Sequence, residues 1–239
     1  PNFLQFKLIA TPRGTRHPRG PPNPREELNM KITVIGAGNM GSAFVKQLTR
    51  AGHKVSVTSR DRAKAAQVAA AHPGAVAVPA AGAAAGADAV VLATGYADAV
   101  AALKALGDLK GKVVIDITNP LTADYMGLTL GHSTSAAEEI AKAVPEAEVV
   151  KAFNTLFAQV LADGADFGAG QKATVFYASD SVRAKQTASA VAETLGFKTV
   201  DAGGLKNARY LEPLAGLNVH LGYGAGLGTG RPPAWIRKA

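Results

Sequence analysis

The sequence predicts an α/β fold built on a doubly wound parallel sheet, with a small C-terminal α/β extension. From Met30 onward, short apolar runs rich in β-branched residues alternate with longer helical patterns. A glycine-rich turn follows the first of these runs and opens the first helix. The chain has 239 residues, of which 47% are hydrophobic, so it can form one substantial domain with a small appendage.

Six strands are expected in the first part of the chain. Each is a short run dominated by Val, Ile and Ala, which is typical of strands buried on both faces of a parallel sheet. The segments between them are long enough for right-handed crossover connections. The six strands are expected at residues 31–36, 54–59, 75–78, 88–94, 112–118 and 147–153.

Helices are expected between these strands. The first covers residues 39–50 and ends before Gly52, a residue that suits a helix C-terminus. The alanine-rich stretch 80–87 is expected to contain one short helix. The other helices are expected at residues 61–71, 96–106 and 136–144, the last opened by the capping box Ser135-Ala-Ala-Glu138.

The rhythm changes after Asn154, where two strands at 173–179 and 198–203 flank a helix at 181–195, and a last helix covers 207–220. The chain therefore divides, in prediction, into three parts. Residues 1–29 form a basic, proline-rich arm that is expected to be extended or disordered. Residues 30–154 form a nucleotide-binding domain, and 155–239 form a small C-terminal domain for substrate binding or dimerisation.

Composition excludes several classes of function. The chain has no cysteine, and its five histidines show no spacing typical of metal ligands, so no metal centre is expected. The formal charge of +8 is spread along the chain and aromatic residues make up only 6%, which argues against a nucleic-acid partner. No apolar run is long enough to span a bilayer, so a cytoplasmic protein without a membrane partner is expected.

A glycine motif lies between the first strand and the first helix. Gly36-Ala37-Gly38-Asn39-Met40-Gly41 matches the G-x-G-x-x-G pattern of Rossmann folds. In that pattern the first glycine permits a tight turn, the second lets the backbone approach a pyrophosphate, and the third lets helix and strand pack closely. The motif therefore predicts a dinucleotide site; the alternative is a glycine-rich turn without a ligand.

The end of the second strand indicates which dinucleotide is bound. NAD-binding proteins place Asp or Glu about 20 residues after the first glycine, but this sequence has Thr58, Ser59 and Arg60 there. Ser59 can donate a hydrogen bond, Arg60 can bind phosphate with two N–H groups, and Lys64 adds a second cation. The pattern predicts NADP(H). The alternative is that Arg60 and Lys64 are ordinary surface charges and that Asp61 binds ribose.

Three loops are expected to meet at the nicotinamide. Thr94 and Gly95 follow the fourth strand, Asn119 and Pro120 follow the fifth, and Asn154 follows the sixth. The amides of Asn119 and Asn154 are candidates for contact with the nicotinamide or the second substrate. Turn chemistry is the alternative, since Asn-Pro commonly opens a turn. Glu138 is interpreted as a helix cap, and His132 as a surface histidine, although a proton donor is possible there.

The segments "MKITVIGAGNMGSAF", "TSRDRAK", "DITNPL", "TSAAEEIAKAVPEAEVVKAFNT" and "VDAGGLKNARYLEPLAG" together resemble the NADPH-dependent reductases of 8-hydroxy-5-deazaflavin (coenzyme F420) and their bacterial relatives. The resemblance implies a Rossmann domain that binds NADP and a small C-terminal domain. It implies that Ser59, Arg60 and Lys64 hold the 2′-phosphate. Hydride would pass directly between the two ring systems without an acid or base, and a homodimer is expected.

Some residues depart from the archaeal members of that family. The stretch after the fourth strand and the amide of Asn154 replace an expected Trp and His, while Lys206 and Arg209 come to the region expected near the second substrate. FMN or FAD is therefore a second possible acceptor. Two other functions stay open: an imine reductase of the pyrroline-5-carboxylate reductase type, which would need a long helical dimerisation domain, and a non-catalytic NADP-binding redox sensor.

Overall fold

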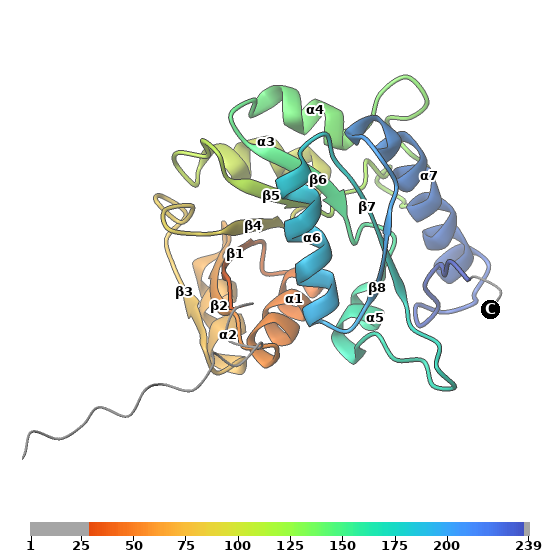
Figure 1. Ribbon diagram of the computed structural model, residues 1–239, viewed down its shortest axis with the longest axis horizontal. Coiled ribbons are helices and arrows are strands. Elements are labelled where there is room, and N and C mark those ends of the chain that lie inside the picture. Colours follow the sequence, from red (N-terminus) through yellow and green to blue (C-terminus); the bar gives the residue numbers. More distant parts are fainter. Residues whose placement is uncertain (1–28, 237–239) are drawn as a thin grey trace, which may run out of the picture.

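An eight-stranded sheet runs through the molecule, with helices on both faces (Figure 1). The computed structural model describes residues 29–236, so the predicted arm lies outside the described residues except for Asn29. All the expected strands are present, each shorter than expected by one to three residues. They are β1 (Lys31–Ile35), β2 (Lys54–Thr58), β3 (Ala75–Ala77), β4 (Ala89–Leu92), β5 (Val113–Asp116), β6 (Glu148–Ala152), β7 (Thr174–Ala178) and β8 (Lys198–Asp201).

The strand order is β3-β2-β1-β4-β5-β6-β7-β8. The first six strands are parallel, and the chain moves outward from β1 in one direction and then from β4 in the other. This confirms the doubly wound fold. Ligands of such sheets bind beyond the carboxyl ends of the strands where the order reverses, which here is between β1 and β4.

The C-terminal extension continues the same sheet. Strand β7 pairs with β6 in the antiparallel direction, and β8 pairs with β7 in parallel, so the last two strands run against the first six. Sequence patterns did not indicate this reversal. The strands β7 and β8 are hydrogen-bonded into the same sheet as the first six strands. A domain boundary between residues 154 and 155 stays a prediction.

The α-helices agree with the expected positions, with two exceptions. A short helix after β6, α5, had not been expected, and the stretch 80–87 is a series of turns rather than a helix because Gly82 and Gly86 adopt positive φ angles of 81° and 70°. The helices are α1 (Asn39–Arg50), α2 (Arg62–Ala71), α3 (Tyr96–Lys104), α4 (Ala136–Ala143), α5 (Ala158–Asp163), α6 (Val182–Thr194) and α7 (Ala208–Val219).

Alternate residues of the strands build separate cores on the two faces of the sheet. Ile32 and Val34 of β1 belong to the cluster that includes residues of α1, α2, α5 and α6, whereas Ile35 of the same strand belongs to the cluster that includes residues of α3, α4 and the start of α7. On the first face, the ring of Phe153 makes edge contacts with Phe44 and Phe197 at centroid distances of 5.0 and 6.2 Å. These cores fix the relative positions of the strand ends, where the candidate site lies.

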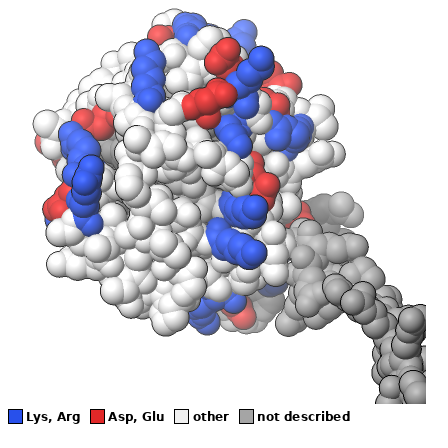
Figure 2. Space-filling model, turned by 90° about the vertical axis from the view of Figure 1, so that its left-hand side faces the viewer, with Lys and Arg blue, Asp and Glu red and all other residues white. Residues whose placement is uncertain are grey.

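Charged side chains are dispersed over the surface. On the face at the β3 edge of the sheet, Lys and Arg are scattered among Asp and Glu with large uncharged areas between them (Figure 2). The described residues include no helix long and apolar enough to cross a membrane. They also contain no group of three or more histidine or acidic side chains that could hold a metal ion.

Candidate functional site

A pocket of about 500 Å³ opens beside the carboxyl ends of β1, β2 and β4. It brings together seven of the residues that the sequence singled out: Gly36, Gly38, Ser59, Arg60, Lys64, Thr94 and Gly95. Its lining also includes Asp61, Asp98 and an apolar wall of alanines at 80, 101, 102 and 105. The pocket therefore lies where the order of the parallel strands reverses, as expected for a dinucleotide site.

The three glycines of the motif have different surroundings. A Cβ on Gly36, whose φ is 114°, would lie 2.2 Å from the carbonyl oxygen of Ala93, and one on Gly41 would lie 1.9 Å from that of Gly36. Both positions thus require glycine for close packing. Gly38 has no atom within 4 Å of its Cβ position and precedes α1, which has no side-chain cap. Its open backbone and the positive end of α1 form a cradle suited to a phosphate.

Asn39, Met40 and Gly41 form the first turn of α1 and do not line the pocket. Any contact of Asn39 or Met40 with a phosphate would have to come through backbone N–H groups of this turn, which are the groups that a helix leaves without partners inside it. Their predicted role is compatible with this position. Gly41 instead packs α1 against the preceding turn.

The residues after β2 surround one corner of the pocket. The Ser59 hydroxyl donates to the carbonyl oxygen of Asp61 at 2.5 Å, and the Asp61 carboxylate caps α2 by accepting from the backbone N–H of Lys64 at 3.1 Å. Asp61 was the alternative candidate for ribose binding, and its carboxylate here accepts a hydrogen bond as the cap of α2. Arg60 extends to Asp98 on α3, with Nη2–Oδ2 and Nη1–Oδ1 distances of 2.9 and 3.0 Å.

The loops after β5 and β6 join at a separate point. The Asn119 side chain donates to the backbone oxygen of Asn154 at 2.8 Å, and the Asn154 side chain donates to Asn119 Oδ1 at 2.9 Å and to the oxygen of Leu211 at 2.9 Å. Neither asparagine lines the 500 Å³ pocket, and nor does Pro120, which is buried. The two amides thus fasten the loops to each other and to α7.

Unsatisfied polar atoms mark this edge of the sheet. Among the described residues, the buried atoms Thr94 Oγ1, Thr118 Oγ1, Thr155 Oγ1 and Asn154 Oδ1 have no hydrogen-bond partner. Phe153, just before Asn154, has φ of 59°, a conformation that is strained for a bulky residue. Such orphaned groups and local strain are concentrated at ligand sites. They follow β4, β5 and β6, where the nicotinamide was expected.

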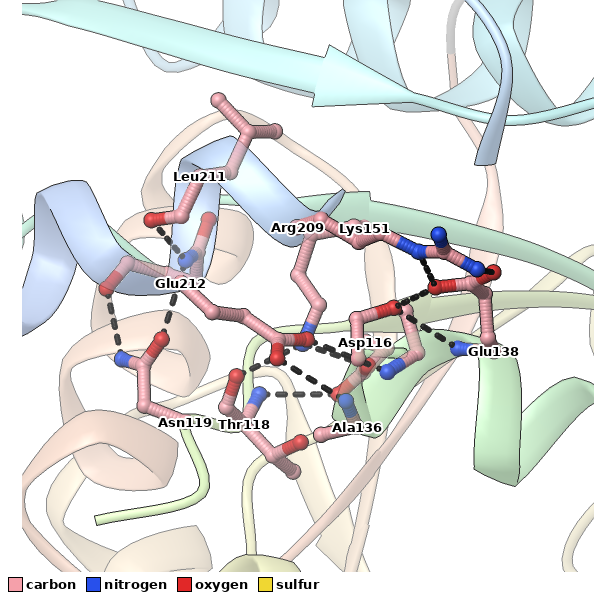
Figure 3. Close-up of polar contacts among 12 residues, drawn as sticks. Asp116, Thr118, Asn119, Ala136, Glu138, Lys151, Arg209, Leu211 and Glu212 are labelled. Atoms are coloured by element: carbon pink, nitrogen blue, oxygen red, sulfur yellow. Dashed lines mark hydrogen bonds and ion pairs between the residues drawn. The ribbon is translucent and has the colours of Figure 1, made fainter. Parts of the chain in front are cut away.

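Three buried charges lie next to these loops, on the α4 side of the sheet (Figure 3). Lys151 Nζ lies 2.7 Å from Asp116 Oδ2 and 2.9 Å from Glu212 Oε1, and it donates to the oxygen of Thr118 at 2.7 Å. The exposed fraction of each charged side chain is 1% or less. The network thus joins β5, β6 and α7 beneath the loop that carries Asn119.

The second carboxylate of this network also closes a helix end. Glu212 accepts from the backbone N–H groups of Ala136 and Ala137, at 2.8 and 3.1 Å, at the start of α4 (Figure 3). A helix N-terminus stabilises a negative charge, so the start of α4 helps to stabilise the buried carboxylate of Glu212. Burial raises the pKa of the nearby Tyr96 phenol, and the charges of Glu139, Glu212 and Asp116 raise it further. The phenol therefore stays protonated at neutral pH.

Ser135 caps α4 as expected, but Glu138, the second member of the expected capping box, accepts from the Ser135 hydroxyl instead of the Ser135 backbone N–H. The Ser135 hydroxyl accepts from the Glu138 N–H at 3.2 Å and donates to Glu138 Oε2 at 2.7 Å. Arg209 binds the same carboxylate with Nε and Nη2 at 2.9 and 2.7 Å, and these hydrogen bonds lower the pKa of Glu138. Arg209 is thus paired with Glu138. Together with the exposed residues Lys206 and His132 it lines a second cavity of about 520 Å³, distinct from the 500 Å³ pocket.

Sequence reasoning missed the buried charges and Asp98. A signal for the first was present, because Asp116 follows three buried apolar residues in β5 and Lys151 lies between buried apolar residues in β6. A charge in such a run must be paired. The sequence contained no comparable signal for the pairing of Arg60 with Asp98, which lie 38 residues apart.

The residues present fit NADP(H). The open Gly38 cradle suits the pyrophosphate, the cations Arg60 and Lys64 suit a 2′-phosphate, and the orphaned hydroxyl of Thr94 supplies a polar group further along the pocket. A Rossmann sheet with this site is typical of a dinucleotide-binding protein.

Comparison with known proteins narrows the class. Residues 31–120 match the sequence profile of the family described as "NADP oxidoreductase coenzyme F420-dependent". The F420-dependent NADP reductase of Methanothermobacter marburgensis is 32% identical over 209 residues, which cover 80% of this chain and 92% of that protein. The chain belongs to this family of F420-dependent NADP oxidoreductases.

Two further similarities bear on the fold and on the range of relatives. A crystal structure from Arthrobacter sp. FB24, named as a candidate F420-dependent NADP reductase, superposes with a TM-score of 0.75 and 33% identity, covering 84% of this chain and 97% of that one. Rat metalloreductase STEAP3 is 30% identical over 185 residues, which cover 77% of this chain and 36% of that protein. The chain thus spans about a third of the length of STEAP3.

Proposed function

We propose that the protein transfers a hydride between NADP(H) and a ring acceptor, either a deazaflavin of the coenzyme F420 type or a flavin such as FMN or FAD. The observation that carries the proposal is the pocket that gathers Gly38, Ser59, Arg60 and Lys64 at the ends of β1, β2 and β4. Its two cations and its lack of an acidic residue at the position of Ser59 favour a 2′-phosphate over a free ribose hydroxyl.

Each part of the site has a separate task in this proposal. The turn at Gly38 and the first turn of α1, with Asn39 and Met40, hold the pyrophosphate through backbone N–H groups. Ser59, Arg60 and Lys64 hold the 2′-phosphate. The nicotinamide lies against the loops after β4, β5 and β6. These loops carry Thr94, Gly95, Asn119, Pro120 and Asn154.

The bound dinucleotide supplies the hydride, and the chain supplies position and a dry environment. Asn119 and Asn154 lock the loops after β5 and β6 together, and Leu211 ties this pair to α7. A fixed arrangement of this kind raises the rate by holding two rings in contact, so no side chain has to act as acid or base. The proposal assigns positioning roles to both asparagines.

The hydride acceptor has two candidates. Similarity to the archaeal reductase over nearly its whole length supports F420. Similarity to a metalloreductase supports an acceptor other than F420, for which a flavin is the second candidate. Asn154 and the residues after β4 differ from those expected in archaeal F420 reductases, and these differences support a flavin as the second candidate acceptor.

Anaerobic oxidation of NADPH, followed by absorbance, distinguishes these acceptors. F420, FMN and FAD are supplied in parallel at equal concentration, and we expect rapid reduction of one of them and much slower reduction of the others. Oxidation of NADPH by none of the three, with NADPH binding retained, would contradict the proposed catalysis and favour a non-catalytic redox sensor.

The cofactor assignment has its own test. The substitution Arg60→Glu removes a charge-assisted contact and adds repulsion, so we expect NADPH binding to weaken by about 2 kcal/mol or more while NADH binding changes little. Isothermal titration calorimetry measures both. Equal affinity of the native protein for NADH and NADPH would contradict the assignment.

A further inference from the structure

Asp98 reaches into the cofactor pocket from α3. It lies in the first turn of that helix, whose residues Ala101 and Ala102, with the C-cap residue Ala105, contribute to the apolar wall of the pocket. Both of its carboxylate oxygens engage the end of the Arg60 side chain, at 2.9 and 3.0 Å. The residue that is expected to bind the 2′-phosphate is therefore already paired with an anion of the protein.

The geometry of this pair imitates a phosphate contact. Carboxylate and phosphate both accept two parallel N–H bonds from a guanidinium, and the Nη1–Nη2 edge of Arg60 serves Asp98. A phosphate bound at the same guanidinium would face the negative charge of Asp98 at close range. Two anions on one arginine repel each other, so Asp98 and a 2′-phosphate compete for Arg60.

The pair is suited to exchange. The side chains of Arg60 and Asp98 are 84% and 44% exposed, and ion pairs with such exposure contribute little to stability. Asp98 also keeps a favourable environment when it loses Arg60, because it lies in the first turn of a helix, where a negative charge is stabilised. A doubly charged phosphate, with Lys64 as a second cation, can therefore displace it.

We propose that Asp98 is a specificity-determining residue: its carboxylate occupies Arg60 in place of the cofactor's 2′-phosphate and holds the affinity for NADP(H) below the value that Arg60 and Lys64 alone would give. The inference rests on the proposed function, since it requires the 2′-phosphate to bind at Arg60. It makes the affinity for NADP(H), but not that for NAD(H), depend on a residue from the opposite wall of the pocket.

Calorimetric titration of NADP⁺ and NAD⁺ into the full chain tests the proposal with four proteins: native, Asp98→Asn, Arg60→Ala and the double variant. We expect Asp98→Asn to bind NADP⁺ about threefold more tightly or better, with unchanged NAD⁺ affinity. In the Arg60→Ala background, the same substitution should change NADP⁺ affinity little, because its effect passes through Arg60. Asp108→Asn, which removes an equal charge from an exposed loop outside the pocket, should leave both affinities unchanged.

Each other outcome has a distinct meaning. Unchanged or weaker NADP⁺ binding by Asp98→Asn, in a protein whose preference for NADP⁺ is lost on Arg60→Ala, would overturn the competition and leave the proposed cofactor site intact. Equal tightening in the Arg60→Ala background would also overturn it, because the effect would then be a general one of charge. Native protein without a preference for NADP⁺ would overturn both the cofactor site and the role of Asp98.

Discussion

At the scale of single residues, Gly38 and Gly41 separate two functions of one glycine motif. A methyl group on Gly41 would collide with the backbone oxygen of Gly36, whereas one on Gly38 would enter open space. We expect Gly41→Ala to lower the free energy of unfolding by about 1–3 kcal/mol, as overpacking does. Gly38→Ala should change it by only about 0.5 kcal/mol and should instead weaken NADP⁺ binding.

Urea denaturation and calorimetric titration of the two variants check this pair of expectations. Each variant serves as the control for the other, because the substitution is the same and the positions are three residues apart. A stable Gly41→Ala protein, or a Gly38→Ala protein that binds NADP⁺ as well as the native chain, would contradict the assignment of roles.

His53 is a second residue whose surroundings have a measurable effect, because they determine the protonation state of its ring. It is buried, its Nδ1 accepts from the backbone N–H of Met30 at 3.2 Å, and its Nε2 lies 2.9 Å from Thr194 Oγ1, which itself donates to Val191. These contacts require the neutral ring with its proton on Nε2. Burial lowers the pKa of His53, so the folded protein binds this proton less readily than the unfolded chain does.

The protein should therefore lose stability as the pH falls. Above the unfolded pKa of about 6.5 the histidine is neutral in both states, and below it the unfolded state takes up the extra proton. We expect the free energy of unfolding to drop more between pH 7.5 and 5.5 in the native protein than in His53→Gln, by at most about 1.4 kcal/mol, which is the limit for one proton over one pH unit. Urea denaturation at the two pH values measures the difference.

The exposed residue His220 provides the control for this experiment. His220→Gln should keep the pH dependence of the native protein. The same slope in His53→Gln and the native chain would show that His53 does not carry the effect.

At the scale of secondary structure elements, one buried lysine holds four of them together. Lys151 of β6 bonds to Asp116 and the Thr118 carbonyl at the end of β5 and to Glu212 of α7, which also caps α4. Removing a single member of a buried ionic network leaves uncompensated charges in the interior. The network thus couples the Asn119 loop to the helices on that face.

We expect Lys151→Met to lower the free energy of unfolding by about 3–5 kcal/mol, because two carboxylates then lie buried without their cation. Lys142→Met, which removes an exposed lysine paired with Glu139, should lower the free energy of unfolding far less, because exposed ion pairs contribute little to stability. Chemical denaturation of both variants provides the comparison. Similar losses in the two would contradict a structural role for the buried network.

Elements that depend on a local sequence pattern could be predicted, whereas those that depend on contacts between distant segments could not. Strands such as β1 and β4 could be predicted because a short run of apolar β-branched residues is typical of a strand buried on both faces of a parallel sheet. Helix α5 was missed because six residues are too few for a helical period to be recognised, and 80–87 was wrongly predicted because alanine propensity is overridden by Gly82 and Gly86. The antiparallel entry of β7 depends on pairing between distant segments, which no local pattern records.

The candidate site divides in the same way. The turn at Gly36 and Gly38 and the cluster at Ser59, Arg60 and Lys64 could be predicted, since each depends on local spacing after a strand. The partners of these residues could not be predicted, because contacts such as that of Arg60 with Asp98 arise only when the first turn of α3 comes next to the loop after β2 in the folded protein.

At the scale of the whole molecule, an apolar surface remains on α7 and the segment after it. Leu217, Leu221 and Leu227 line one groove there and are 55%, 38% and 46% exposed, and Tyr223 is 63% exposed nearby. Exposed apolar areas of this kind are typical of contacts between protein chains. We propose that this surface joins two copies of the chain in a homodimer.

Light scattering after size-exclusion chromatography tests the dimer. We expect the native protein to elute with twice the mass of the chain and Leu217→Asp to elute as a monomer, because a charge is costly in an apolar interface. Val182→Asp, on α6, replaces another exposed apolar residue and should remain dimeric. Native protein of single-chain mass would contradict the proposal.

The reversal of strand direction at β7 has a consequence for how the molecule unfolds. Helix α6 follows β7 in the chain, yet it packs on β5 and β6 as well as on β7 and β8. The single tryptophan, Trp235, lies against Phe176 of β7 with ring centroids 6.4 Å apart, so its fluorescence reports on the reversed strands.

Because α6 spans both directions of the sheet, neither group of strands can lose its structure without exposing the core of the other. We expect tryptophan fluorescence and far-ultraviolet circular dichroism to follow one urea transition with the same midpoint. Two separate midpoints would indicate independent units that meet near residue 154. A single midpoint would mean that the last two strands, although reversed, form one cooperative unit with the nucleotide-binding sheet.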